Sequence, residues 1–164
     1  MRAMSKLAAA LALTTIAGVA SAQQASDPHC GNFVAFVVND DVTVVDQGPE
    51  GASPGDQRII RGRLTDTDGN RIGRQHAIAT ISHSSVEGEP LFYVTLLETF
   101  DVGTVASTAM IPSPNALDPS SRPDASYQRA VTGGTGDFAH ATGTVTLEST
   151  ADGSRRATYD LDCG

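Results

Sequence analysis

The sequence has 164 residues, 11 basic and 19 acidic side chains, and a net charge of −8 at pH 7. A chain this acidic is poorly suited to nucleic acids and anionic membranes, so we expect neither as a partner. Its single lysine, Lys6, falls within a predicted export signal. Schiff-base lysine chemistry and a GxxxxGK[ST] phosphate loop are therefore excluded from the mature chain.

Residues 1–22 are typical of a signal peptide. Arg2 and Lys6 supply the basic start, an apolar stretch follows, and Ala20-Ser21-Ala22 forms an A-x-A cleavage site. The apolar run is shorter than the ~20 residues a bilayer needs, so we expect no membrane insertion after cleavage. The remaining 23–164 form one predicted domain with a net charge of −10, secreted or periplasmic.

Cys30 and Cys163 are the two cysteines of the chain. In the oxidising compartment that export implies, a single disulfide between them is the expectation, and two free thiols are the alternative. No histidine or cysteine stands at C-x-x-C or H-x-x-x-H spacing, so no metal site is predicted. No cofactor is expected either.

Short apolar and β-branched runs alternate with glycine, proline, asparagine and aspartate clusters, and no long segment carries a helical period. Eight strands joined by short connections favour an all-β, closed, eight-stranded antiparallel up-and-down barrel, because closure removes exposed strand edges. The predicted strands are Phe33–Asp46, Gln57–Thr65, Arg71–His83, Leu91–Thr99, Gly103–Ile111, Tyr127–Val131, Gly143–Ser149 and Arg155–Leu161.

Two connections and one basic cluster complete this pattern. Asp68-Gly69 predicts a tight hairpin turn, because these residues tolerate positive φ. Pro112–Ala125 holds four of the eight prolines and predicts a long exposed loop, either a lid over the barrel mouth or an inert connection. Arg58, Arg61 and Arg63 are expected on an exterior face beside acidic residues.

A glycine-rich segment spans residues 130–139. Gly133, Gly134 and Gly136 predict a tight irregular turn between strands, with Phe138 placed to fill apolar space beside it. No helix pattern follows and no G-x-G-x-x-G is present, which argues against a nucleotide site.

This segment resembles the V-x-G-G-T-G-x-F-x-x-A-x-G signature of dirigent proteins and allene oxide cyclases. Ile72-Gly73-Arg74-Gln75-His76 is similar to the V-G-R-A-Q of a dirigent strand, and the positions of the two cysteines match the terminal disulfide of many dirigent proteins. The resemblance implies an eight-stranded antiparallel barrel and, since these proteins usually form trimers, a homotrimer. Similarity of fold says little about the substrate.

The resemblance also implies candidate acids. Asp137 stands where dirigent proteins that close a quinone-methide ring have an aspartate, and Asp40 is nearest to their acidic residue on the first strand. A one-residue slip would put Asn39 in that position instead. Thr142 replaces the family's arginine, the histidine before the acid is lost, and Val37 replaces the allene oxide cyclase carboxylate. The latter chemistry is therefore disfavoured.

A carboxyl group buried in an apolar barrel stays protonated and can donate a proton as a ring closes, so Asp40 and Asp137 are the predicted catalytic residues. The alternatives are a turn-capping role for Asp137 and a solvated strand end or bulge for Asp40. A pocket of at least ~300 Å³ is expected beside them. The candidate substrate-binding residues are Phe36, Asn39, Tyr93, Phe100 and Tyr127.

These observations favour an exported dirigent-like barrel that binds a hydrophobic small molecule and steers its stereoselective coupling or cyclisation, an activity closest to an isomerase or cyclase. Two alternatives stay open. One is a carrier of hydrophobic ligands without chemistry, and the other is a structural barrel whose interior is filled by side chains.

Overall fold

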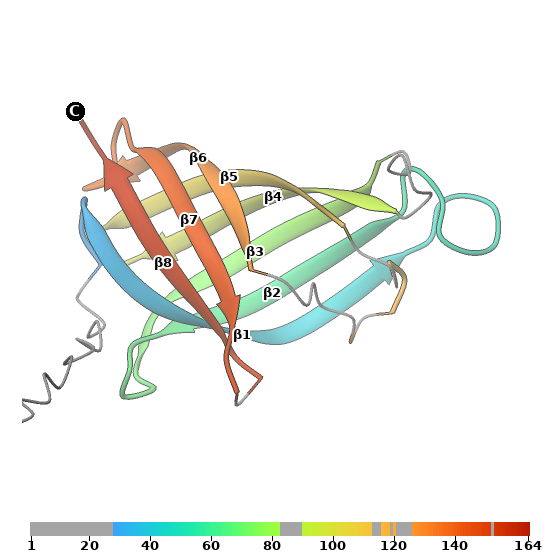
Figure 1. Ribbon diagram of the computed structural model, residues 1–164, viewed down its shortest axis with the longest axis horizontal. Coiled ribbons are helices and arrows are strands. Elements are labelled where there is room, and N and C mark those ends of the chain that lie inside the picture. The colour runs from blue at the N-terminus through green and yellow to red at the C-terminus, as the bar shows by residue number, and fades with distance from the viewer. Residues whose placement is uncertain (1–27, 83–89, 113–115, 119, 121–125, 152) are drawn as a thin grey trace, which may run out of the picture.

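The computed structural model describes residues 28–82, 90–112, 116–118, 120, 126–151 and 153–164. These residues form a closed antiparallel barrel in which each strand pairs with the next and β8 pairs with β1 (Figure 1). The predicted fold class is confirmed. The strands are β1 (Asn32–Val45), β2 (Gln57–Thr65), β3 (Arg71–Ile81), β4 (Leu91–Phe100), β5 (Gly103–Pro112), β6 (Tyr127–Gly136), β7 (Thr142–Ser149) and β8 (Arg155–Asp162).

The expected signal peptide and most of the Pro112–Ala125 connection lie outside the described residues. Two described residues of that connection, Ala116 and Leu117, pack against the apolar side chains at one end of the barrel. Across the part of the chain that the structure describes, no helix is long and apolar enough to cross a membrane.

The glycine-rich segment differs from its prediction. Gly133, Gly134 and Gly136 belong to β6 and pair with β5, and the turn comes after them, at residues 137–140. A Cβ atom at Gly134 would overlap the carbonyl oxygens of Thr104 and Phe138, so this close approach requires glycine. Phe138 is fully buried, which confirms its predicted place in apolar space.

β1 contains an irregularity that decides which of its polar residues face the interior. The pairing of β1 with β2 shifts between Asn39 and Asp41, which makes Asp40 the extra residue of a bulge. Before the bulge, odd-numbered residues such as Val37 face inward; after it, Val42 lies opposite Ile60, which lines the interior. The bulge therefore sends Asn39 inward and Asp40 outward.

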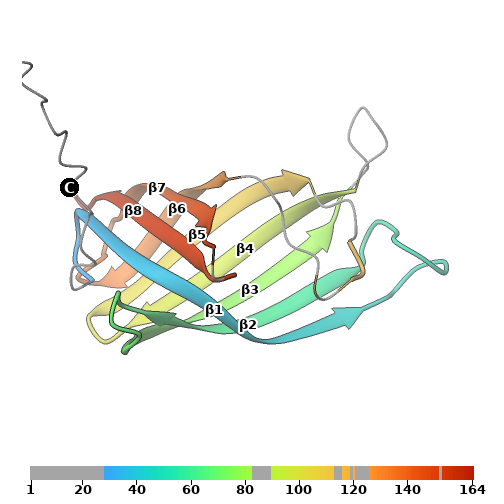
Figure 2. The same ribbon diagram turned by 60° about the horizontal axis from the view of Figure 1, so that its bottom comes forward.

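The interior has two apolar regions, and Figure 2 shows the barrel that encloses both. At the packed end, an aromatic cluster fills the space: Phe33 stacks on Tyr159 with ring centroids 4.1 Å apart, and Phe100 and Phe138 approach at 5.6 Å. The other region, called the hollow half, is built from smaller side chains. Its buried members are Ala77, Ala79, Ile81, Phe92, Val94, Leu96, Ile111 and Ala116.

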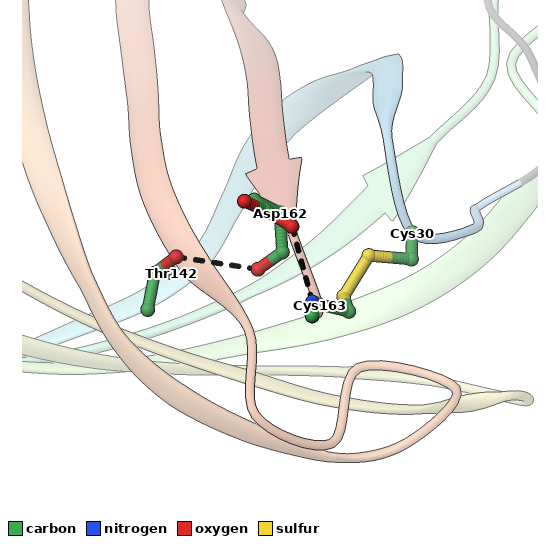
Figure 3. The surroundings of a disulfide bond; sticks show 5 residues. Cys30, Thr142, Asp162 and Cys163 are labelled. Carbon is green, nitrogen blue, oxygen red and sulfur yellow. Dashed lines mark hydrogen bonds between the residues drawn. A yellow bond between two sulfur atoms is a disulfide. The ribbon is translucent and has the colours of Figure 1, made fainter.

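The predicted disulfide is present and joins the two ends of the described chain. Cys30, just before β1, is bonded to Cys163, just after β8, with their Cα atoms 6.3 Å apart (Figure 3). Both cysteines pack against the core of the packed end. The bond joins two residues 133 positions apart in the sequence, for which chain entropy predicts a stabilisation of up to about 5 kcal/mol.

Candidate functional site

A cavity of about 60 Å³ lies in the hollow half of the barrel. It is smaller than the ~300 Å³ expected for a drug-sized ligand. Two arginines, Arg58 and Arg155, are among the residues that line it. The lining residues are Val37, Asn39, Arg58, Ile60, Gln75, Ala77, Ala79, Phe92, Val94, Leu96, Ile111, Tyr127, Leu147 and Arg155.

Both arginines contact aromatic rings of the cavity wall. The Arg155 guanidinium lies 5.3 Å from the centre of the Tyr127 ring, and its Nη1 donates a hydrogen bond of 3.0 Å to the Tyr127 hydroxyl. The Arg58 guanidinium lies 5.9 Å from the centre of the Phe92 ring. The wall thus combines apolar surface with a few polar groups, as small-molecule sites do.

Polar side chains interrupt the apolar interior between the two regions. On each of four consecutive strands, one inward-facing polar residue separates the hollow half from the packed end: Gln75 on β3, Glu98 on β4, Ser107 on β5 and Arg129 on β6. All four are buried, and the Tyr159 hydroxyl from β8 is buried as well. We call these five residues the polar layer.

An ion pair forms the centre of the polar layer. Arg129 Nη2 donates a hydrogen bond of 3.0 Å to Glu98 Oε1, and both side chains are completely buried. Burial by itself lowers the pKa of Arg129, but the attraction of the Glu98 carboxylate, the influence of Tyr159 and Tyr127, and the hydrogen bond to Glu98 together outweigh it, so the pKa of Arg129 is raised. Burial also raises the pKa of Tyr159 well above its ordinary value, which keeps its hydroxyl neutral.

The two predicted catalytic aspartates lie outside the cavity. Asp40 is exposed at the β1 bulge and pairs with Arg63, which is also exposed. Asp137 is exposed in the turn after β6, where its backbone N–H donates to the Val102 carbonyl at 2.9 Å. Neither carboxyl is buried in apolar surroundings, the condition on which the proton-donor hypothesis depended.

The predicted binding residues are divided between three places. Asn39 and Tyr127 line the cavity. Phe100 is buried in the aromatic cluster of the packed end instead. Tyr93 is 46% exposed and Phe36 borders a shallow surface depression, so both lie on the outer face of the barrel. Alternation along each strand explains this, because a shift of one residue moves a side chain to the opposite face.

Sequence reasoning missed the buried polar residues. Arg61 and Arg63 are on the exterior and pair with Asp41 and Asp40, as expected, but Arg58 is 5% exposed and faces the cavity. Its place on the same face of the strand as Ile60 and Leu64 was the available signal. In the same way, Glu98 shares a face with apolar residues two positions away on either side, Leu96 and Phe100.

The described residues contain no group of three or more histidine, cysteine, aspartate or glutamate side chains arranged to hold a metal ion. Every cysteine in these ranges is in the disulfide.

Comparison with known proteins supports the barrel fold. No protein-family model matches the sequence, and no curated protein matches it significantly. Among solved structures, a pyocyanin demethylase aligns with a TM-score of 0.66 and 24% identity, over 80% of this chain and 99% of the other. The Diels-Alderase AbmU from Streptomyces koyangensis aligns with a TM-score of 0.58 and 17% identity, over 77% of this chain and 60% of the other.

A further similar structure is the intermolecular Diels-Alderase AbnU, with a TM-score of 0.56 and 13% identity, over 79% of this chain and 96% of the other. At these identities the likeness establishes the fold and leaves the reaction open. The chain has the barrel architecture of proteins whose reported activities concern small molecules.

Proposed function

We propose that this chain is an exported barrel protein that binds a hydrophobic small molecule in its hollow half and steers the cyclisation or coupling of that molecule. The observation that carries the proposal is the cavity, whose wall is largely apolar and holds Asn39, Gln75 and Tyr127 as orienting polar groups. An apolar wall of defined shape restricts the conformations of a bound molecule, and so favours one product over its stereoisomers.

Two further observations support this function. The similar structures include a demethylase and Diels-Alderases, which act on small molecules, and a cyclase reported to catalyse a [4 + 2] cycloaddition. The glycine-rich segment and the cysteine positions resemble those of dirigent proteins. Membership of that family, export and the homotrimer stay predictions.

The binding step is tested by filling the cavity. Ala79 lines it, so Ala79→Leu places three additional carbon atoms inside it. We expect the affinity for 4-methylanisole, a small apolar probe measured by calorimetry, to fall at least about tenfold, because the bound ring and the new side chain compete for one space. Ala130→Leu makes the same change at an exposed position of β6 and should leave the affinity unchanged. Equal affinities in all three proteins would refute the cavity as the binding site.

A second experiment separates the enzyme from the carrier. The protein is incubated with a small-molecule extract of its source organism, and the mixture is analysed by mass spectrometry. Cyclisation by isomerisation conserves mass, so an enzyme converts one compound into an isomer with a different retention time, whereas a carrier returns its ligand unchanged. No conversion, together with retained binding of the same ligand, would leave the carrier as the function.

The proton-donor role of Asp40 or Asp137 is tested with the same assay. Because both side chains are exposed, we expect Asp40→Asn and Asp137→Asn to keep both ligand binding and product formation. Loss of product with either variant, at unchanged binding, would support the original hypothesis for that residue.

A further inference from the structure

The polar layer contains more polar atoms than it pairs. Among the described residues, Glu98 Oε2, Gln75 Oε1, Ser107 Oγ, the Tyr159 hydroxyl, and Arg129 Nε and Nη1 are buried without a hydrogen-bond partner. Folded proteins pair nearly all buried polar groups, because each unpaired group costs the free energy of its lost hydration. So many unpaired atoms in one layer indicate a place where another molecule completes the hydrogen bonds.

The polar layer adjoins the cavity on three strands. On β3, Gln75 belongs to both, and its Cα atom is directly opposite that of Glu98 on β4. On β4, Leu96 lines the cavity and Glu98 is the next residue on the same face, about 7 Å further along the strand. On β6, Tyr127 lines the cavity and Arg129 is the next residue on the same face of the strand. Gln75 therefore lines the cavity itself, and Glu98 and Arg129 lie next to residues that line it.

Two of the unpaired atoms are acceptors that lie in or next to the cavity lining, and they define one group that a ligand must offer. Oε1 of Glu98 is held by Arg129, which leaves Oε2 as an acceptor, and Oε1 of the neighbouring Gln75 is a second acceptor. A carboxylate oxygen can accept hydrogen bonds but cannot donate them. A ligand group that pairs with either of these oxygens is consequently a donor, an O–H or N–H, whereas the unpaired Nε and Nη1 of Arg129 require an acceptor.

We propose that the polar layer selects hydrophobic ligands that carry a hydrogen-bond donor, such as a phenol or an enol, and that Glu98 Oε2 accepts the hydrogen bond of this donor. The inference rests on the proposed function and names its substrate class. A ligand without a donor leaves the buried carboxylate oxygen unpaired and is discriminated against, because a site built for a polar group rejects an analogue that lacks it. Arg129 acts as a positioning residue by holding the other oxygen of Glu98.

The test compares 4-methylphenol with 4-methylanisole, whose methyl ether removes the donor. At pH 7 the phenol is neutral, since phenols of this type titrate near pH 10. We expect the wild-type protein to bind the phenol about tenfold or more tightly than the ether, because a hydrogen bond to a charged group contributes an affinity difference of at least this size. In Glu98→Gln the preference should fall below about threefold, because the new acceptor is uncharged.

The control is Glu148→Gln, which makes the same change at a half-exposed carboxylate on β7. It should keep the wild-type preference. Glu98→Gln leaves the charge of Arg129 buried without its ion partner, which can unfold the protein. For this reason Glu98→Gln/Arg129→Met, which removes both charges, and Gln75→Leu, which keeps the ion pair, are measured in parallel after circular dichroism confirms folding. Both should lower the preference for the phenol.

Each outcome decides between the two proposals. Equal affinity of the wild-type protein for phenol and ether overturns the inference about Glu98, and so does a preference that survives in the Glu98 variants. If the ether binds and Ala79→Leu weakens its binding, the cavity function stands in either case. If neither probe binds the wild-type protein, both proposals fail.

Discussion

The packed end and the hollow half of the barrel follow the same alternation of inward and outward side chains, yet only one of them is filled. Three phenylalanines and a tyrosine meet at the packed end, whereas Ala77 and Ala79 line the hollow half next to the cavity. In a closed barrel the number and stagger of the strands determine the diameter, so the size of inward side chains decides how much space remains. Whether a barrel of this kind is packed or hollow depends on a few interior positions.

The largest expected effect comes from opening the packed end. Phe138→Ala removes a fully buried ring that contacts Phe33 and Phe100, and should lower the free energy of unfolding by about 3–5 kcal/mol. Phe92→Ala, at the wall of the cavity, should cost less, because this ring already borders empty space. Urea unfolding followed by circular dichroism measures both. Equal losses would show that the two regions are packed alike.

Removal of the disulfide should destabilise the fold but leave ligand binding in the hollow half unchanged. Cys30→Ser/Cys163→Ser takes away a bond between residues 133 positions apart in the sequence, and we expect a loss of about 2–4 kcal/mol in unfolding free energy. The affinity for 4-methylanisole should stay within about twofold of wild type, because the cysteines pack against the other region. A large loss of affinity would instead mean that the two regions are coupled.

Larger side chains test the difference in packing between the two regions from the opposite direction, because they add volume instead of removing it. Ala157→Leu overfills the packed end, where this alanine is completely buried, and should cost about 1–3 kcal/mol in unfolding free energy. Ala79→Leu inserts the same side chain beside the cavity and should cost less than about 1 kcal/mol, because space is available there. Thermal unfolding of the two variants makes the comparison, and a larger cost at Ala79 would contradict it.

The smallest expected effect concerns pH and the loop between β1 and β2. Backbone N–H groups of Gln47 and Ser53 donate to the Asp56 carboxylate at 2.8 and 2.7 Å, and these bonds lower its pKa below the ordinary value of 3.8. A carboxyl group with a lowered pKa in the folded state stabilises the fold above pH ~4, and this stabilisation is lost as the pH falls through its folded pKa.

Asp56→Asn should therefore flatten the decline of unfolding free energy below pH ~4, as measured by urea unfolding across a pH series. The same substitution at Asp160, which is exposed on β8, serves as the control. An unchanged pH profile in Asp56→Asn would argue against this role of the loop.

Much of the fold could be predicted from the sequence. Alternating apolar residues placed all eight strands, and the predicted Gln57–Thr65 coincides with β2. The glycine-rich segment was located correctly but assigned to a turn, because glycine is typical both of turns and of strands that approach another backbone closely. Only the contacts of Gly134 with β5 and with Phe138 distinguish the two.

The candidate site was less accessible to sequence reasoning. The choice between Asn39 and Asp40 depended on the bulge in β1, and a bulge reverses the faces of all residues on one side of it. The polar residues among apolar ones on β3 to β6 were visible in the sequence, but the contacts between them in the folded barrel were not. Glu98 and Arg129 are 31 residues apart and come together only because the barrel places β4 and β6 on either side of β5.

The sequence by itself therefore determined the strands, the closed barrel and the pairing of its two cysteines, because these follow from local alternation, turn residues and the absence of other thiols. Only the tertiary structure decided which inward side chains meet, and with it the position of the cavity, the exposure of Asp40 and Asp137, and the buried ion pair between Glu98 and Arg129. The reason is physical: burial and pairing are properties of side chains brought together from distant strands, and strand register and bulges control that meeting.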